Sequence, residues 1–163
     1  MALSLARPRE GEELVRILTA PGMGKCIGCY SCMLACARYV YNDYSPHKSA
    51  IQVRTQGGMQ GRMVADICRA CVQAPCALAC PTGALTIRKG GRGMTYRKKL
   101  CIGCRLCLEA CPAKVIYWDD DEERPIVCIF CGQCVKYCPH GCLEMAEVPE
   151  VPVEEVPEEV VDA

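Results

Sequence analysis

The stretch CIGCYSCMLAC, from Cys26 to Cys36, places four cysteines within eleven residues, separated by two, two and three other residues. The same spacing returns in CIGCRLCLEACP at 101–112 and in CIFCGQCVKYCP at 128–139. A further block, CRACVQAPCALACP at 68–81, widens the middle gap to four residues. Repetition of this kind indicates that one local structure is built four times along the chain.

The four blocks use sixteen of the seventeen cysteines, and only Cys142 is left over. Disulfides are not expected, because the N-terminal sequence has no secretory signal pattern and so many adjacent sulfurs cannot pair without strain. Reduced thiols point instead to metal ligands and to a cytoplasmic protein. No run of residues is long and apolar enough to predict a membrane span.

The spacing of the cysteines distinguishes a zinc site from an iron–sulfur site. Zinc sites usually take two ligands from each of two CxxC pairs that a longer insert separates. Three cysteines at CxxCxxC spacing, followed by xxxC, match the bacterial ferredoxin run, in which the last cysteine ligates the other of two clusters. The sequence therefore predicts four 4Fe–4S clusters. The predicted ligands are Cys26, Cys29, Cys32, Cys36, Cys68, Cys71, Cys76, Cys80, Cys101, Cys104, Cys107, Cys111, Cys128, Cys131, Cys134 and Cys138.

Composition and charge agree with buried clusters. Aromatic residues make up only 6% of the 163 residues, so the apolar core is expected to be thin for this length. The last seventeen residues hold seven acids and no Lys or Arg, which leaves the rest of the chain basic. Thiolate-ligated clusters are anions that need compensating charge, so the basic surplus is assigned to them rather than to a nucleic-acid partner.

Three segments are expected along the chain: an N-terminal lead-in at 1–24, a four-cluster domain at 25–146 and an acidic tail rich in Pro and Val at 147–163. The lead-in is predicted to contain a short helix at 12–18. Each block is predicted to be a loop with a short helix that carries its last cysteine. Gly-rich or acidic turns after the first three blocks predict β-hairpins. The fold class is thus α+β, with two interlocked dicluster modules and an extended tail.

Residues 20–146 resemble the four-cluster electron-transfer subunits of molybdenum and tungsten oxidoreductases. Blocks three and four are similar to bacterial ferredoxin motifs, and CRACVQAPCALACPTGAL is similar to the second motif of those subunits. Block one, followed by NDYSPHKSAIQV, resembles the small subunit of tungsten aldehyde oxidoreductases and of related benzoyl-CoA reductases.

The resemblance implies that block one pairs with block four and block two with block three. It implies one ligand set of Cys26, Cys29, Cys32 and Cys138, and a second of Cys36, Cys128, Cys131 and Cys134. The other two implied sets are Cys68, Cys71, Cys76 and Cys111, and Cys80, Cys101, Cys104 and Cys107. The spacing alone equally permits sequential pairing of block one with two and block three with four.

The implied function is a non-catalytic relay in an anaerobic oxidoreductase complex. One end would meet a pterin-bearing tungsten or molybdenum subunit, with an aldehyde oxidoreductase favoured. The other would meet a flavin subunit, a ferredoxin or another copy of the chain. Alternatives are the cluster subunit of a formate dehydrogenase, hydrogenase, carbon monoxide dehydrogenase or benzoyl-CoA reductase. A zinc-binding scaffold or nucleic-acid adaptor is the alternative from another class.

Residues outside the ligand set have lesser expected roles. Cys142 is expected to be a buried small hydrophobic residue rather than a ligand. His47 and His140 are expected at the surface or in hydrogen bonds. Basic residues beside the ligands are expected to raise cluster potentials, and the isoleucine after each block's first cysteine to shield a cluster. These residues are Lys25, Arg69, Arg105 and Lys136, and Ile27, Ile102 and Ile129; Tyr30, Tyr137 and Trp118 are expected in the core.

Overall fold

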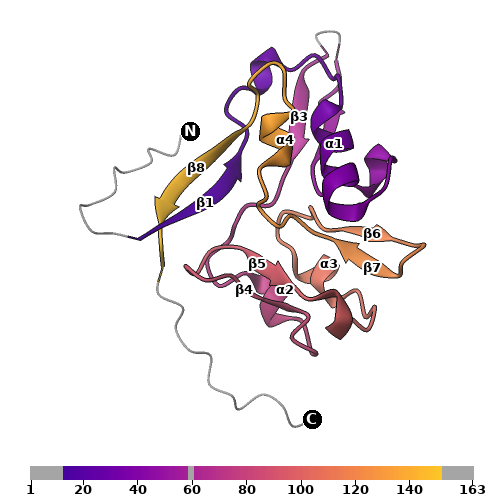
Figure 1. The fold of residues 1–163 in the computed structure, drawn as a ribbon, viewed down its shortest axis with the longest axis vertical. Coiled ribbons are helices and arrows are strands. Elements are labelled where there is room, and N and C mark those ends of the chain that lie inside the picture. The colour runs from indigo at the N-terminus through magenta and orange to yellow at the C-terminus, as the bar shows by residue number, and fades with distance from the viewer. Residues whose placement is uncertain (1–12, 59–60, 152–163) are drawn as a thin grey trace.

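The computed structural model describes residues 13–58 and 61–151 and is a small mixed α+β structure (Figure 1). Short helices and two-stranded sheets alternate along the chain. The helices are α1 (Ser31–Cys36), α2 (Pro75–Leu78), α3 (Leu106–Ala110) and α4 (Gln133–Lys136). The strands are β1 (Leu14–Thr19), β2 (Gln52–Thr55), β3 (Met63–Asp66), β4 (Leu85–Ile87), β5 (Met94–Tyr96), β6 (Tyr117–Asp119), β7 (Arg124–Ile126) and β8 (Glu144–Pro149). Among the described residues, no helix has the length and apolar character needed to cross a bilayer.

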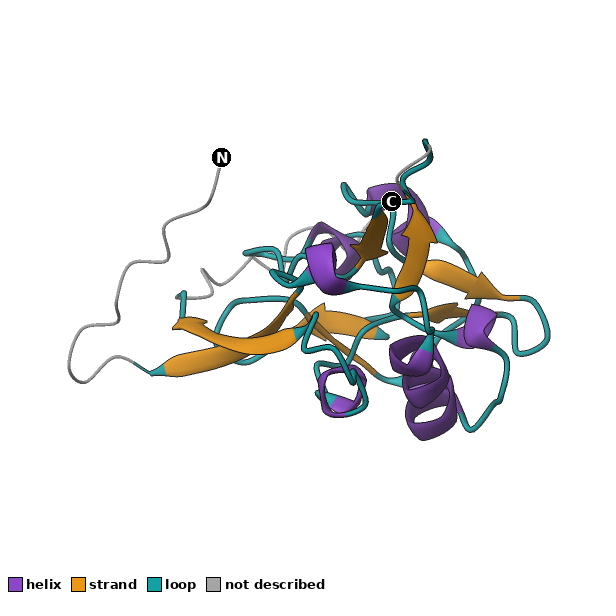
Figure 2. Cartoon of the chain, turned by 90° about the horizontal axis from the view of Figure 1, so that it is seen from above, coloured by secondary structure: helices purple, strands orange, loops and turns teal. Residues whose placement is uncertain are grey.

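The three expected hairpins are present. Strands β2 and β3, β4 and β5, and β6 and β7 pair as antiparallel neighbours, each after one of the first three cysteine blocks. The sheets are separate rather than joined into one layer. Figure 2 shows the helices distributed among these small sheets instead of covering a common face. The hairpins therefore act as spacers that return the chain from one cysteine loop to the next.

The helix predicted at 12–18 is wrong over its described part: residues 14–18 lie in β1, which pairs antiparallel with β8 near the other end of the described chain. Residue 12 lies outside the described residues. The register of the pair runs from Leu14 opposite Pro149 to Thr19 opposite Glu144. The apolar spacing in LVRILT resembles a helical stripe, but pairing with a strand distant in sequence decides the conformation. The sheet contains residues of all three expected segments: β1 belongs to the lead-in, and β8 runs from the end of the four-cluster domain into the tail as far as Pro149. Residues 152–163 lie outside the described residues.

The helices also differ in one detail from the expectation. Each carries the third cysteine of its block, but only α1 also contains the fourth, Cys36. The other three fourth cysteines follow the end of their helix. A proline comes directly after each of them and disfavours helical geometry at the preceding residue. After Cys36 the residue is Ala37, and the chain continues into a π-helical turn over Ala37–Tyr41.

Two apolar cores correspond to the two pairs of blocks. One is built mainly from blocks one and four, and the other from blocks two and three. In Figure 1, α1 and α4 lie beside each other in one half of the ribbon, and α2 and α3 lie in the other half. The cores meet at the end of β7, where Ile126 belongs to the first and Val127 to the second, each 1% exposed. This short segment is the seam between the two halves.

Three contacts hold the seam. The Tyr41 hydroxyl donates a hydrogen bond to the Val127 carbonyl at 2.6 Å and accepts one from the Val127 N–H at 2.8 Å. The Lys48 ammonium lies 3.2 Å from the carboxylate of Asp119, which is almost fully buried. Phe130 lies against Gly93, where an added Cβ would come within 2.7 Å of the phenyl ring. The halves are thus joined by backbone, charge and packing together.

Replacement of Tyr41 by Phe should lower the free energy of unfolding by about 1–3 kcal/mol, because the buried N–H and C=O of Val127 lose their partner. Denaturant unfolding of the anaerobic protein measures this change. The control is Tyr39→Phe, which removes a hydroxyl from a 56% exposed side chain whose only hydrogen bond is to Tyr137. Equal stability of the two variants would contradict the role assigned to Tyr41.

Candidate functional site

Every cysteine loop turns twice through the left-handed backbone region. The second residue after the first cysteine has positive φ in all four blocks: Gly28 (71°), Ala70 (47°), Gly103 (72°) and Phe130 (56°). A second residue with positive φ lies one or two positions before the start of each helix: Tyr30 (58°), Gln73 (56°), Arg105 (63°) and Gly132 (75°). Alternation of right- and left-handed residues turns successive N–H groups inward and makes an anion-binding concavity. The loops are therefore shaped to hold anionic groups, at the expense of backbone strain at the residues other than glycine.

The structure brings the sixteen block cysteines together around four cavities, with a set of four at each; Cys128 of the cavity B set also lines cavity C. Cavity A is lined by Cys26, Cys29, Cys32 and Cys138, and cavity B by Cys36, Cys128, Cys131 and Cys134. Cavity C is lined by Cys68, Cys71, Cys76 and Cys111, and cavity D by Cys80, Cys101, Cys104 and Cys107. These are the sets that the resemblance implies, and sequential pairing of the blocks would not bring them together.

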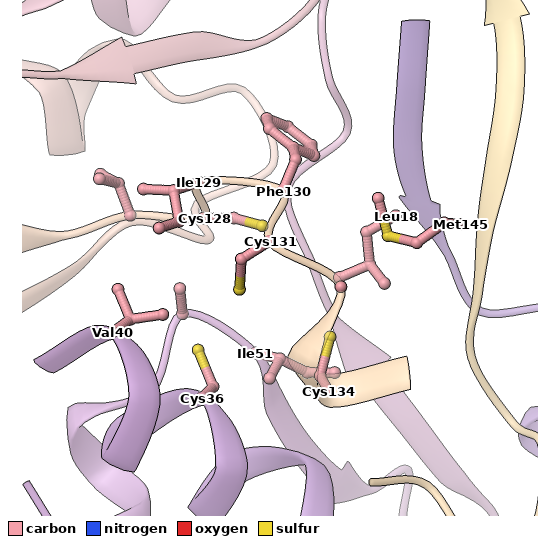
Figure 3. A pocket seen from close by; sticks show the side chains of 13 residues that line it. Leu18, Cys36, Val40, Ile51, Cys128, Ile129, Phe130, Cys131, Cys134 and Met145 are labelled. Atoms are coloured by element: carbon pink, nitrogen blue, oxygen red, sulfur yellow. The ribbon is translucent and has the colours of Figure 1, made fainter. Parts of the chain in front are cut away.

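The space inside each set is larger than a single ion requires. The volumes not filled by protein atoms, partly open to solvent, are about 340, 370, 410 and 330 Å³ for cavities A to D. Among the described residues, no three Cys, His, Asp or Glu side chains are close enough together to hold one metal ion. Figure 3 shows this arrangement in cavity B, where Cys36 approaches from α1 and Cys131 from the opposite loop.

Each pair of cavities shares its helices. Cys32 lines cavity A and Cys36 lines cavity B, although both belong to α1. The pairs Cys76–Cys80, Cys107–Cys111 and Cys134–Cys138 are divided between neighbouring cavities in the same way. Residues four apart lie on one helical face about 6 Å apart along the axis. In α1 one helical turn therefore supplies a sulfur to each of two adjacent sites; in the other blocks the helix supplies the third cysteine and the residues after it supply the fourth.

The two pairs of cavities are also in contact with each other. Cys128 lines both cavity B and cavity C. Together with the shared helices, this contact gives the order A, B, C, D. The four cavities form a single row that runs through the seam between the halves.

Comparison with known proteins identifies the group that these cavities fit. A 4Fe-4S dicluster domain matches residues 100–143, and a 4Fe-4S binding domain matches residues 23–41. The chain binds 4Fe–4S clusters. The sets of four thiols and the shape of the loops are both suited to that cofactor.

Relatives with assigned functions carry similar sequences. The chain is 36% identical over 112 residues to the arsenate respiratory reductase iron-sulfur subunit ArrB of Shewanella sp. (strain ANA-3), covering 61% of this chain and 47% of that one. It is 37% identical over 100 residues to the thiosulfate reductase electron transfer subunit PhsB of Salmonella typhi, covering 57% and 50%. A third relative is the aliphatic sulfonate oxidoreductase, polyferredoxin-like subunit of Pyrococcus furiosus, at 34% over 106 residues, covering 65% and 59%. The chain thus spans about half the length of the first two relatives.

Among solved structures, one match is to a chain of the active site complex BamBC of benzoyl coenzyme A reductase as isolated. The sequence identity is 20%, the TM-score is 0.47, and the match covers 90% of this chain and 84% of the other.

Burial of the cluster sites works against free thiolates. It raises the pKa of Cys32 and Cys107 to about 11 and the pKa of Cys76 and Cys134 to about 12. These four are the third cysteines of their blocks, and all are buried. Iron supplies the positive charge that stabilises a thiolate in such surroundings, because a coordinating thiol is deprotonated outright.

Two of the fourth cysteines are in a different environment. Burial opposes ionisation of Cys80, but hydrogen bonds from the Leu85 N–H and from Thr82 leave its pKa below the usual value. Burial likewise opposes ionisation of Cys138, and backbone hydrogen bonds, the first from Cys142, lower its pKa overall. The N–H to Sγ distances are 3.4 Å at Cys80 and 3.3 Å at Cys138. These donors stabilise negative charge on the two sulfur atoms independently of any metal.

The structure also shows where several residues outside the ligand set lie. Among the basic neighbours of ligands, Arg69 lines cavity C and Arg105 lines cavity D. Ile102 and Ile129 line cavities D and B but are 68% and 48% exposed, and Ile27 is 66% exposed and lines none of the four. Tyr30 and Tyr137 are not in the core as expected: they are 43% and 41% exposed, and Tyr137 pairs with Tyr39 at a ring distance of 5.6 Å. His140 lies in the wall of cavity A and Trp118 in the wall of cavity D.

Cys142 is buried as expected, at 3% exposed, but it also lines cavity A beside the four other cysteines. Sequence reasoning also missed Thr82 and Tyr96, which both line cavity D. The Thr82 hydroxyl lies 3.7 Å from the sulfur of Cys80. Burial raises the pKa of Tyr96, and the neighbouring Cys101 side chain adds to the shift. Thr82 has a local signal, two residues after a fourth cysteine, whereas only the folded hairpin brings Tyr96 to the site.

Replacement of Cys142 by Ala should leave the iron content unchanged, at about sixteen atoms per chain for four cubes. The matched variant Cys32→Ala removes a buried cysteine from the same cavity and should cost up to about four of those atoms. Iron analysis of anaerobically purified protein measures both. A loss of iron in Cys142→Ala as large as in Cys32→Ala would make Cys142 a ligand.

Proposed function

We propose that the chain is a non-catalytic electron-transfer subunit that relays single electrons through four 4Fe–4S clusters. The proposed ligands are the sixteen block cysteines, grouped as they line cavities A, B, C and D. In this arrangement every iron has a cysteine ligand, so the sites carry electrons and leave no position for substrate. The row of cavities is the observation that supports the proposal most directly.

The two ends of the row are open to partners. Next to cavity A, Cys29 is exposed and Ile27 is 66% exposed. Next to cavity D, Cys104 is exposed and Ile102 is 68% exposed. These exposed groups leave the clusters proposed for cavities A and D accessible to a partner protein. A relay needs one such contact to receive electrons and another to pass them on.

The proposed donor or acceptor at one end is a pterin-bearing tungsten or molybdenum subunit, with an aldehyde oxidoreductase favoured by the resemblance of block one and NDYSPHKSAIQV. Relatives named as iron-sulfur or electron transfer subunits of reductases support a role in such a complex. The other end would meet a flavin subunit, a ferredoxin or a second copy, in the cytoplasm. The subunit of a formate dehydrogenase, hydrogenase, carbon monoxide dehydrogenase or benzoyl-CoA reductase is the second candidate.

Anaerobically purified protein should be brown, contain about sixteen irons and accept about four electrons per chain, one for each cube. Iron analysis and a reductive titration followed by electron paramagnetic resonance measure these quantities. Colourless protein with about four zinc ions would support the zinc scaffold instead. Iron without electron uptake would contradict the relay.

Gentle affinity capture from the native host, followed by tungsten and molybdenum analysis, identifies the partner. Recovery of a large chain with bound tungsten and aldehyde-oxidising activity is the expected result. A bait stripped of iron serves as the control, because loss of the clusters should remove the folded docking surface. Recovery of nucleic acid alone would contradict the proposal, and recovery of a different oxidoreductase would favour the second candidate.

Removal of one sulfur from cavity C tests the order of the row. Cys71→Ala should lower electron transfer through the reconstituted complex at least tenfold, because this cavity lies between the other half and cavity D. Turnover with a soluble electron acceptor measures the rate, with Cys142→Ala as the control. An unchanged rate would show that electrons bypass cavity C.

A further inference from the structure

The four cavities differ in polarity, and cavities B and D are the extremes. Apart from its cysteines, cavity B is lined by nine residues, all of them apolar or glycine. Cavity D is lined by eight other residues, of which four carry hydrogen-bond donors: Thr82, Tyr96, Arg105 and Trp118. Two sites built from the same cysteine motif thus differ in the number of hydrogen-bond donors that line them.

Two of the donors in cavity D are buried without a partner. Among the described residues, only four buried side-chain nitrogen or oxygen atoms make no hydrogen bond, and two of these are the Tyr96 hydroxyl and the Trp118 Nε1. An unpaired buried donor costs about 1–3 kcal/mol, so folded proteins seldom leave one. Two such donors in the wall of a single cavity imply an acceptor inside it.

Sulfur is the acceptor that the cavity is built to contain. Cys80 already receives the Leu85 N–H at 3.4 Å and lies 3.7 Å from the Thr82 hydroxyl. The Arg105 guanidinium stacks over the Trp118 ring at 4.5 Å and places a positive charge at the mouth of the cavity. That charge is largely solvent-exposed and hence screened. The buried neutral donors should therefore have the larger effect.

We propose that Tyr96 and Trp118 donate hydrogen bonds to sulfur in cavity D, and that these bonds make it the site of highest reduction potential in the row. This inference rests on the proposed function, because it takes a cluster to be held by the four cysteines of cavity D. Uptake of one electron adds one negative charge, and no covalent bond forms or breaks. Side-chain donors that face sulfur stabilise the added charge, and the residues that line cavity B, apart from its cysteines, offer no side-chain donor.

A redox titration with a chemical reductant, followed by electron paramagnetic resonance, tests the inference. Tyr96→Phe should make one of the four reduction steps about three- to tenfold less favourable, which is a shift of about 30–60 mV for one electron. The affected step should be the one that occurs first in the wild-type protein. Thr82→Val and Trp118→Phe should shift the same step in the same direction.

The matched control is Tyr117→Phe. Tyr117 is a partly buried tyrosine on β6 that lines none of the four cavities. Its replacement should leave all four steps unchanged. A control shift equal to that of Tyr96→Phe would overturn the inference, because the effect would then be general to tyrosine removal.

A second measurement has a wild-type arm that does not depend on how well the variants fold. Electron–nuclear double resonance of the partly reduced wild-type protein, in H2O and in D2O, detects exchangeable protons close to the cluster. Exchangeable couplings from side chains at the first-reduced cluster are expected, one of which disappears in Tyr96→Phe and another in Trp118→Phe. Their absence from the wild-type spectrum would overturn the inference.

The failure of this inference is distinguishable from the failure of the proposed function. Full iron content and uptake of about four electrons, with all steps unshifted in the three donor variants, would overturn the inference alone. Wild-type protein without iron, or without electron uptake, would overturn both.

Discussion

A helical turn with a cysteine on either side of it is the unit on which the arrangement depends. Because residues four apart share a helical face, α1 presents Cys32 to cavity A and Cys36 to cavity B. The fixed rise of the helix then sets the separation of the two sites, whatever the loops around them do. In the other three blocks the helix ends before the fourth cysteine, which still lines the neighbouring cavity. Two cavities built on common helices are held together by covalent structure as well as by packing.

The parts of the structure that local sequence determines were predictable. The cysteine spacing gave the loops and short helices, and glycine or acidic turns gave the three hairpins, β2–β3, β4–β5 and β6–β7. The 4Fe–4S cofactor followed from the same spacing. Local sequence did not decide which blocks pair, because helices of one turn have no preference for a partner. Only the resemblance to a family distinguished the nested pairing from the sequential one.

The features that the sequence did not predict depend on contacts between residues distant in the chain. Leu14–Thr19 has an apolar pattern that suits a helix equally well, and its partner β8 lies at the other end of the described chain. Tyr96 comes to cavity D through the fold of the β4–β5 hairpin, and nothing in its immediate sequence marks it. Cys142 was correctly expected to be buried, but its position beside four other sulfurs was not foreseen. In each case the conformation or position of the residue is determined by its tertiary neighbours rather than by its type.

The nesting of the blocks has a consequence for biosynthesis. The four ligands proposed for each of cavities C and D all come from 68–111, so they have all been translated before block four exists, although Cys128 of block four also lines cavity C. Cavities A and B require Cys128 and Cys138 in addition to block one, and β1 must wait for β8. Domains fold as units during translation, from the N-terminus onward. Cavities C and D can therefore form first, and cavities A and B and the β1–β8 sheet form last.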